Sequence, residues 1–213
     1  MVSRGCCNTM IPPEYAYDIL AIDPGTDTLG ASLLRLDVRV EDIELLYAGT
    51  WHASRRYDPD GDIALGYGNR AARIQEHRRS LTSLLQEYQP QAVACETPFI
   101  GRFKQSGMAL SELFSAIQTT VIDFDPTVSF LGVDNRSAKR AVGIMTSRVG
   151  KDDVRQKVLN LMNITPRNGV VLANLDEHAI DSIAVGYFAA ELLFEEWRIL
   201  DDHRNGKVGT KRR

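Results

Sequence analysis

The sequence predicts a single α/β domain in which a mixed, five-stranded sheet carries helices on both faces. Short apolar runs bounded by turn residues are typical of strands, and amphipathic stretches of helical period alternate with the later runs. One run, AVACE (residues 92–96), is apolar up to its acid, as expected of a central parallel strand. The 213 residues, 44% of them hydrophobic, suffice for one core. We expect a flexible leader over residues 1–13, the domain over 14–200 and a basic C-terminal tail over 201–213.

The first half of the chain predicts an antiparallel meander followed by a long helix. The meander comprises a strand at Tyr17–Ile22, the turn Asp23–Thr26, and strands at 30–37 and 43–53 joined by short turns. A polar loop is expected over 57–68. The helix runs from about Asn69 to Tyr88, and Pro90 ends it.

The second half predicts strands and helices in alternation. The expected elements are a strand at 92–96, a helix capped by Ser111 that reaches Val121, a strand at 127–133, helices near 137–142 and 152–162, and a last, strongly apolar helix from about Leu175 to Trp197. Three strands, a helix, and then strand, helix, strand and helices is the order of the ribonuclease H-like fold.

Composition excludes several classes of protein. No apolar run reaches membrane-spanning length, and the N-terminal residues lack the apolar core of a signal peptide, so we expect a cytoplasmic or otherwise intracellular protein. Cys6, Cys7 and Cys95 form no paired framework and no zinc-ligand spacing, which predicts reduced thiols. A net charge of −3 does not indicate a nucleic-acid binder. However, basic residues cluster at Arg70–Arg79, Arg102–Lys104, Arg136–Arg140, Arg148–Lys157 and Lys207–Arg213, and such clusters suit phosphate contacts as well as solvated faces.

Three acidic positions carry the strongest chemical signal. Asp23 and Glu96 each follow a buried strand, and Asp181 lies on the last helix, one turn after His178. Carboxylates at the ends of adjacent strands, met by one from a packed helix, form an oxygen-rich cage that suits Mg²⁺ or Mn²⁺. Such ions are typical of phosphodiester hydrolysis, so the pattern predicts a nuclease. His178 alone would more often be a core histidine, but its i, i+3 spacing from Asp181 favours a ligand.

Four stretches resemble the RuvC family of Holliday junction resolvases. They are DILAIDPGTDTLG, AVACETPF, NRSAKRAVGIMTSRVGKDDVRQKV and DEHAIDSIAVGYFA, in the family's order between Asp18 and Ala190. The resemblance implies that Asp23, Glu96, His178 and Asp181 are the catalytic metal ligands and that Lys139 and Lys151 are its basic residues. Phe99 matches an aromatic that the family uses near the junction centre. The ETPF run and the two extra tails suggest a divergent or viral member, which would act in the host cytoplasm if viral.

The resemblance also implies an activity. We expect a structure-selective endonuclease that uses two Mg²⁺ ions, or Mn²⁺ in their place, and no small-molecule cofactor. Its product ends would be 5′-phosphate and 3′-hydroxyl, and Lys151 would neutralise phosphate charge during the reaction. The expected DNA-binding residues are Phe99, Arg102, Lys104, Arg136, Lys139, Arg140, Arg148 and Lys151.

Other interpretations stay open from sequence. A homodimer is expected because paired cuts across a two-fold junction need two active sites, with the helix face Leu110–Val121 as its interface. The main alternative is a related nuclease that acts on other branched DNA, flaps or RNA. A junction-binding protein without activity is a further alternative, and so is an actin-like phosphotransferase, which shares only the first turn.

Overall fold

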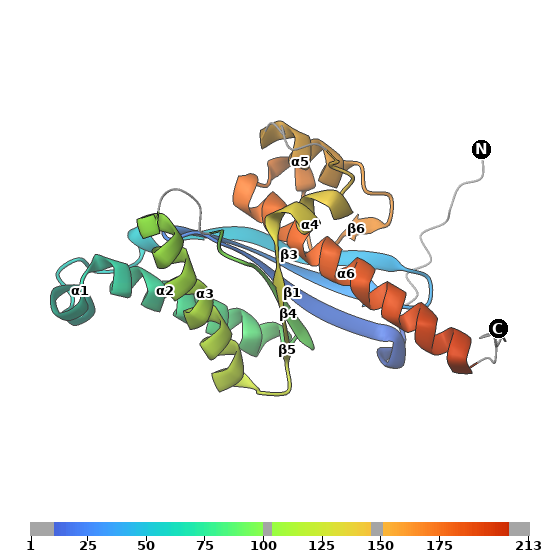
Figure 1. The fold of residues 1–213 in the computed structure, drawn as a ribbon, viewed down its shortest axis with the longest axis horizontal. Helices are drawn as coiled ribbons and strands as arrows, with labels where there is room; N and C mark the ends of the chain where they lie inside the picture. The colour runs from blue at the N-terminus through green and yellow to red at the C-terminus, as the bar shows by residue number, and fades with distance from the viewer. Residues whose placement is uncertain (1–10, 100–103, 146–150, 205–213) are drawn as a thin grey trace.

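A six-stranded mixed sheet forms the centre of the computed structural model, which describes residues 11–99, 104–145 and 151–204 (Figure 1). The strands are β1 (Ala16–Pro24), β2 (Thr28–Asp37), β3 (Asp42–His52), β4 (Ala92–Glu96), β5 (Ser129–Val133) and β6 (Ile164–Pro166), in the spatial order β5-β4-β1-β2-β3-β6. β1, β2 and β3 form the predicted antiparallel meander, while β4 pairs parallel with β1 and β5 parallel with β4. The class matches the predicted ribonuclease H-like α/β fold.

The predicted strand count of five was wrong, because β6 adds a sixth strand beside β3. Ile164 pairs with Ile43 in parallel, and the backbone N–H of Arg167 donates to the carbonyl of Leu45 at 2.9 Å. β6 has three residues and ends in Pro166, which an edge strand tolerates because its outer side needs no donor. Such a short segment carries no period from which a strand can be predicted.

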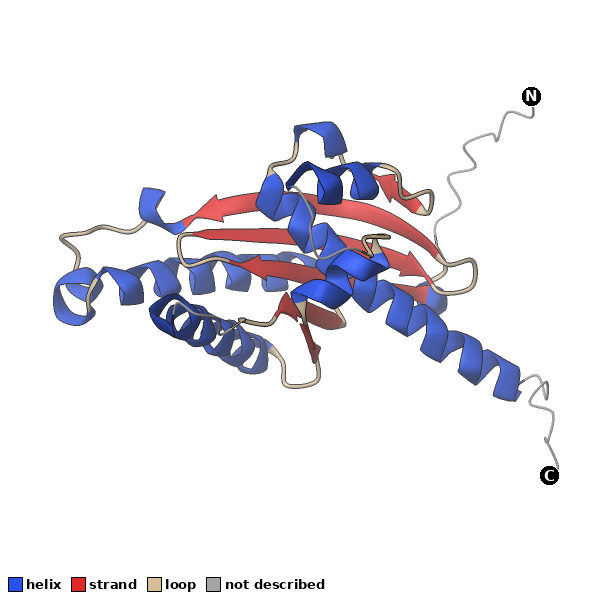
Figure 2. Ribbon diagram, turned by 45° about the horizontal axis from the view of Figure 1, so that its top comes forward, coloured by secondary structure: helices blue, strands red, loops and turns tan. Residues whose placement is uncertain are grey.

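Helices cover both faces of the sheet, as predicted (Figure 2). They are α1 (Asp62–Tyr67), α2 (Asn69–Tyr88), α3 (Lys104–Phe124), α4 (Asn135–Ala141), α5 (Lys151–Leu159) and α6 (Glu177–Arg204), with single 3₁₀ turns at Pro13–Tyr15, Ala53–Arg55 and Leu172–Asn174. α2 and α3 pack on one face around Leu20, Ile22 and Val93. α6, flanked by α4 and α5, packs on the other face around Ile19, Ala21 and Ala94.

Several helix boundaries differ from those predicted. α3 begins at Lys104, so Ser111 is no cap: it lies inside the helix, and its hydroxyl donates to the carbonyl of Gly107. α1 falls within the segment predicted as a polar loop. α6 continues to Arg204, so residues 201–204 of the expected tail belong to the helix, and the remainder of that tail, like residues 1–10 of the leader, lies outside the described residues. None of the described helices is both long and apolar enough to cross a membrane.

Two glycines let α6 lie directly on the sheet. A Cβ on Gly30 of β2 would lie 2.1 Å from the backbone carbonyl oxygen of His178. A Cβ on Gly186, two turns further along α6, would lie 2.9 Å from the Cβ of Ala21 in β1. No side chain larger than hydrogen fits at either point without a shift. The first turn of α6 is therefore held against β2 at Gly30. Gly30 is also the residue of β2 that pairs with Asp23 of β1, so this turn lies next to Asp23.

Candidate active site

Strand alternation directs two carboxylates toward α6. Successive side chains of a strand point to opposite faces, and Ala21 of β1 and Ala94 of β4 belong to the core under α6. Asp23 and Glu96, each two residues further along its strand, therefore point to the same face. Because β1 and β4 are parallel and Ile22 pairs with Cys95, the two acids lie at the same edge of the sheet.

The start of α6 supplies the other two side chains. Asp176 caps the helix, since its carboxylate accepts from the backbone N–H of Ala179 at 3.0 Å and from the hydroxyl of Thr50 at 2.5 Å. His178 and Asp181 follow in the first turns, three residues apart and hence on one helical face.

His178 is bonded at both ring nitrogens. Its Nδ1 lies 2.9 Å from Oδ2 of Asp23, and its Nε2 lies 2.9 Å from the hydroxyl of Thr28. The hydrogen bond to Asp23 raises the pKa of His178, against the opposing effect of burial. Because Nδ1 faces a carboxylate, it carries the proton, and Thr28 holds the ring from the other side.

Among the described residues, no cationic side chain is hydrogen-bonded to Glu96 or Asp181 in this way. Burial, together with the charge of Asp23, raises the pKa of Glu96 to about 7, although hydrogen bonds from Asn135 act to lower it. Those bonds run from Nδ2 of Asn135 to both carboxylate oxygens, each at 3.0 Å. Burial and Asp23 likewise raise the pKa of Asp181 to about 6. Nearby Lys139 acts in the opposite direction on both acids but does not cancel the shift.

The donor set fits a hard divalent cation in its chemistry. Three carboxylates and an imidazole could supply oxygen and nitrogen ligands. The raised pKa values of Glu96 and Asp181 reflect burial first and repulsion from Asp23 second, and a bound cation would favour the charged form of both acids. Among the described residues, no three His, Cys, Asp or Glu side chains are already grouped as metal ligands. The bonds to Thr28 and Asn135 account for part of this, because they hold His178 and Glu96 on protein partners.

Phe99 and Arg136 border the acids on the side of β4. They line a surface pocket of about 590 Å³ together with Glu96, Thr97, Pro98, Asp134 and Asn135. Phe99 is 84% exposed, so it does not plug the core beneath its loop. Lys139 is half-buried on α4 and Arg140 is exposed.

The remaining predicted DNA-binding residues are only partly described. Arg102 and Arg148 lie outside the described residues. Lys104 and Lys151 are the first residues of α3 and α5, where their backbones but not their side chains are described. Their contacts with DNA stay predictions.

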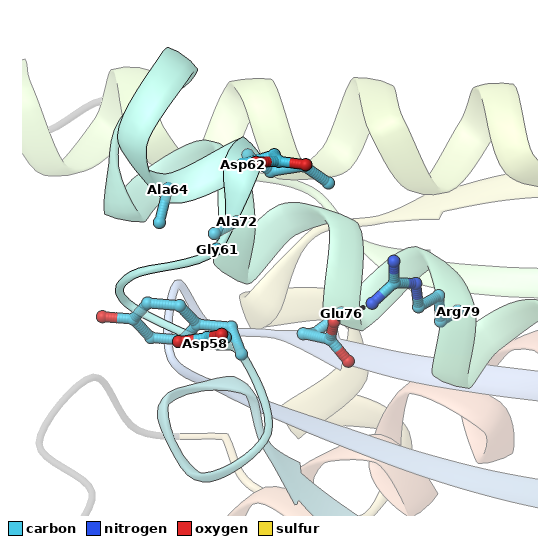
Figure 3. Close-up of a pocket in the computed structure, with 9 residues that line it drawn as sticks. Asp58, Gly61, Asp62, Ala64, Ala72, Glu76 and Arg79 are labelled. Atoms are coloured by element: carbon cyan, nitrogen blue, oxygen red, sulfur yellow. Dashed lines mark hydrogen bonds and ion pairs between the residues drawn. The ribbon is translucent and has the colours of Figure 1, made fainter.

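A second pocket lies in the connection between β3 and α2, away from the acids (Figure 3). It has a volume of about 290 Å³ and is lined by Tyr57, Asp58 and Asp62, with the ion pair between Glu76 and Arg79 on its far wall. None of the four expected metal ligands lines it.

Sequence reasoning missed three residues that organise the site. Thr28 and Asn135 act through contacts with residues that lie 150 and 39 positions away in the chain. Gly30 acts through the absence of a side chain. A period or motif spacing encodes none of these contacts, although Gly30 closes the DPGTDTLG stretch.

Comparisons with known proteins indicate the family of the chain. A family model described as crossover junction endodeoxyribonuclease RuvC matches residues 19–187, which include all four candidate ligands. The RuvC endodeoxyribonuclease of Cytophaga hutchinsonii is 26% identical over 178 residues, covering 78% of this chain and 80% of the relative. That of Chlorobium phaeovibrioides is 29% identical over 149 residues, covering 69% and 70%.

Solved structures share the fold at low sequence identity. Thermus thermophilus RuvC in complex with a Holliday junction is 17% identical, with a TM-score of 0.58, and the match covers 80% of this chain and 91% of that one. The yeast mitochondrial Holliday junction resolvase is 11% identical, with a TM-score of 0.60 and coverage of 85% and 82%. The fowlpox virus resolvase, solved with junction DNA, is 13% identical, with a TM-score of 0.52 and coverage of 83% and 98%.

Proposed function

Because this chain belongs to the RuvC family, we propose that it is a structure-selective endonuclease that resolves four-way DNA junctions by paired phosphodiester hydrolysis. One observation carries the proposal. Carboxylates from β1, β4 and α6 face one another at one edge of the sheet, and two of them have raised pKa values. Raised pKa values concentrate where a cleft is built to bind a cation or to perform acid–base chemistry.

Asp23, Glu96, His178 and Asp181 are proposed to hold two Mg²⁺ ions, with Mn²⁺ as a substitute. When bound, the ions would supply an activated water and stabilise the leaving 3′-oxygen, so that the ends are 5′-phosphate and 3′-hydroxyl. The chain's own residues prepare the site for this. His178 orients Asp23 through the 2.9 Å hydrogen bond, and Asn135 orients Glu96. Lys139 offsets negative charge, and Lys151 is proposed to face the phosphate.

Phe99 is proposed to enter the junction centre. Its 84% exposure at the rim of the pocket that contains Glu96 favours stacking on an unpaired base over a role in packing. Arg136, Lys139 and Arg140 on α4 would then contact phosphates beside it, with Arg102, Lys104, Arg148 and Lys151 on the neighbouring segments.

A homodimer is the proposed assembly, since two cuts related by two-fold symmetry require two sites. The apolar stripe of α3 cannot by itself form the interface, because Leu113, Ile117 and Val121 are buried in the chain's own core. Met108 and Ile122, which are 61% and 54% exposed, are the outward apolar residues of α3 available for this contact. A monomer in light scattering at micromolar concentration, with and without junction DNA, would contradict the dimer.

Cleavage of a substrate panel tests the proposed function. A four-way junction, a flap, a linear duplex and an RNA–DNA hybrid should be compared in Mg²⁺. We expect paired, symmetric cuts in the junction and slow or no cleavage of the others. Equal cleavage of the flap or hybrid would instead favour the alternative of a related nuclease with another substrate. Binding without any cleavage would indicate a non-catalytic junction-binding protein. We also propose that the protein acts in the cytoplasm.

A further inference from the structure

A third pocket lies beside the turn that follows Asp23, on the face of the sheet opposite α6. Its volume is about 300 Å³, and it is lined by Thr26, Arg70, Arg73, Gln105, Ala109 and Leu110. Thr26 comes from the turn after β1, the two arginines from the start of α2, and the last three residues from α3. The pocket thus joins three elements at the sheet edge that bears the candidate active site.

Polar groups that suit an anion line this pocket. Arg73 has a buried Nε with no hydrogen-bond partner among the described residues. A buried donor without an acceptor is costly, so an anion that reached this guanidinium would offset that cost. The guanidinium of Arg70, the hydroxyl of Thr26 and the amide of Gln105 offer further donors around the same space.

The charges around the pocket leave Arg73 available to an anion. Glu112 pairs with Arg70 at 3.0 Å, on side chains that are about half exposed. The charge of Arg73 helps to lower the pKa of Asp27, but the carboxylate of Asp27 accepts its hydrogen bonds from the backbone N–H and the hydroxyl of Ser54, both at 2.9 Å. His77, below the turn, is buried, and burial lowers its pKa to about 4, so it is neutral near pH 7.

We propose that this pocket binds a backbone phosphate of the DNA strand being cut, one to three nucleotides from the scissile phosphate. The proposal rests on the proposed function for the identity of the ligand. Thr26 is three residues from Asp23, a separation of at most about 10 Å along the chain. DNA advances about 3.4 Å per nucleotide along one strand, so a phosphate one to three positions away spans that distance. Arginine suits this role because its planar guanidinium matches phosphate oxygens.

Salt dependence of junction binding, measured in EDTA so that no cleavage competes, tests the charge contact. Arg73→Gln and Arg70→Gln should each lower the magnitude of the slope of log affinity against log salt by about 0.7–0.9 and weaken binding several-fold. Arg73→Lys should keep the slope near that of the wild type. Arg79→Gln is the matched control, because Arg79 lies on the same helix but lines the pocket near Glu76.

A second arm changes the DNA, so its first measurement uses the wild type and does not depend on the folding of a variant. Junctions carrying one uncharged methylphosphonate at each position within three nucleotides of the cut should show one position at which wild-type binding weakens. Arg73→Gln should be insensitive to that same substitution. If no position matters to the wild type, or if Arg73→Gln keeps the wild-type slope, the pocket does not bind the strand. Thermal stabilisation of the wild type but not of Arg73→Gln by inorganic phosphate, with an unchanged DNA slope, would assign the pocket to a free phosphate instead.

Failure of this inference is distinguishable from failure of the proposed function. If the wild type resolves junctions but the arginine variants bind normally, only the pocket assignment is wrong. If the wild type cleaves no substrate of the panel but Arg73→Gln lowers the salt slope of binding, the pocket binds a phosphate and only the proposed nuclease activity is wrong.

Discussion

The two halves of the candidate active site differ in how their negative charge is balanced. Asp23 is bonded to His178, whose ring is fixed from the other side by Thr28 and whose backbone lies directly on Gly30. No described cation is bonded to Glu96 or Asp181 in the same way, and burial together with Asp23 raises the pKa of each despite nearby Lys139. The negative charge of Asp23 is thus offset by His178 within the protein. The charges of Glu96 and Asp181 would be offset by an external cation, in agreement with the proposed dependence on a divalent metal.

Removal of the carboxylate shared by both halves should have the largest effect. Asp23→Asn keeps the shape of the side chain but loses the charge that binds His178 and that is proposed to bind the metal ions. We expect junction cleavage to fall by about 10³-fold or more, equivalent to about 4 kcal/mol of transition-state stabilisation, with junction binding retained. Single-turnover cleavage and a binding titration measure the two effects. An active Asn variant would refute the carboxylate site.

Displacement of α6 should damage the half that contains His178. Gly30→Ala places a methyl group against the backbone of His178, so the helix must shift. A shift of about 1 Å costs on the order of 10²-fold in rate, and overpacking costs about 1–3 kcal/mol of unfolding free energy. Cleavage rates and thermal melting measure these losses.

Gly66→Ala on α1 is the control for that substitution, because a Cβ there meets nothing within 4 Å. It should leave both the rate and the melting temperature close to those of the wild type. Equal behaviour of the two alanine variants would contradict the close approach of α6 to β2.

Loss of Asn135 should weaken the half of the site that contains Glu96 and Asp181. Among the described residues, Asn135 is the only side chain found to donate a hydrogen bond to Glu96. Asn135→Ala removes both 3.0 Å bonds to Glu96. Partners that orient a metal ligand contribute about 10–100-fold to metal affinity or activity, so the Mg²⁺ concentration for half-maximal cleavage should rise by a factor in this range. Because Asn135 is exposed, the melting temperature should change little. An unchanged Mg²⁺ requirement would show that Glu96 needs no support from Asn135.

Substitution of Phe99 should reduce cleavage by a smaller factor, and mainly for intact junctions. Phe99→Ala removes base stacking worth about 1–3 kcal/mol, so cleavage of an intact junction should fall more than that of a junction already nicked or mismatched at its centre. The side chain is 84% exposed, so the melting temperature should stay within a degree or two, about the size of the effect of a surface substitution. A large loss of melting temperature, with equal loss on both substrates, would mark Phe99 as a packing residue.

The elements that follow from a periodic pattern of apolar residues were predicted from the sequence. Residues that act through tertiary contacts were not. The meander, α2 and β4 follow from apolar period, and α2 runs from Asn69 to Tyr88 as expected. β6 and α1 have three and six residues, too few to show a period. Glu96 was found because an acid ends an apolar strand. Its partner Asn135 lies on another element, and only the tertiary fold brings the two together.

The pH dependence of stability tests the central comparison most directly. The ordinary pKa values are 4.5 for Glu96 and 3.8 for Asp181, and the folded values are about 7 and about 6. The folded state therefore binds more protons than the unfolded state between these values, so its stability falls as pH rises from about 4 to about 7. The raised pKa of His178 acts in the same direction, because its stabilising charge is lost as pH rises through the folded value. The buried His77, whose pKa is lowered from 6.5 to about 4, acts in the opposite direction below about pH 6.5 and offsets part of the fall.

Thermal melting at pH 5 and pH 8, in EDTA and in Mg²⁺, measures this dependence. In EDTA the melting temperature should be lower at pH 8 by about 3–6 °C, which corresponds to roughly 1–2 kcal/mol for a chain of this size. Mg²⁺ should restore it at pH 8 and have little effect at pH 5. The double variant Glu96→Gln, Asp181→Asn should lose the part of the fall that these two acids cause, and with it the restoration by Mg²⁺. Wild-type melting that is the same in all four conditions would contradict a site whose second half awaits a cation.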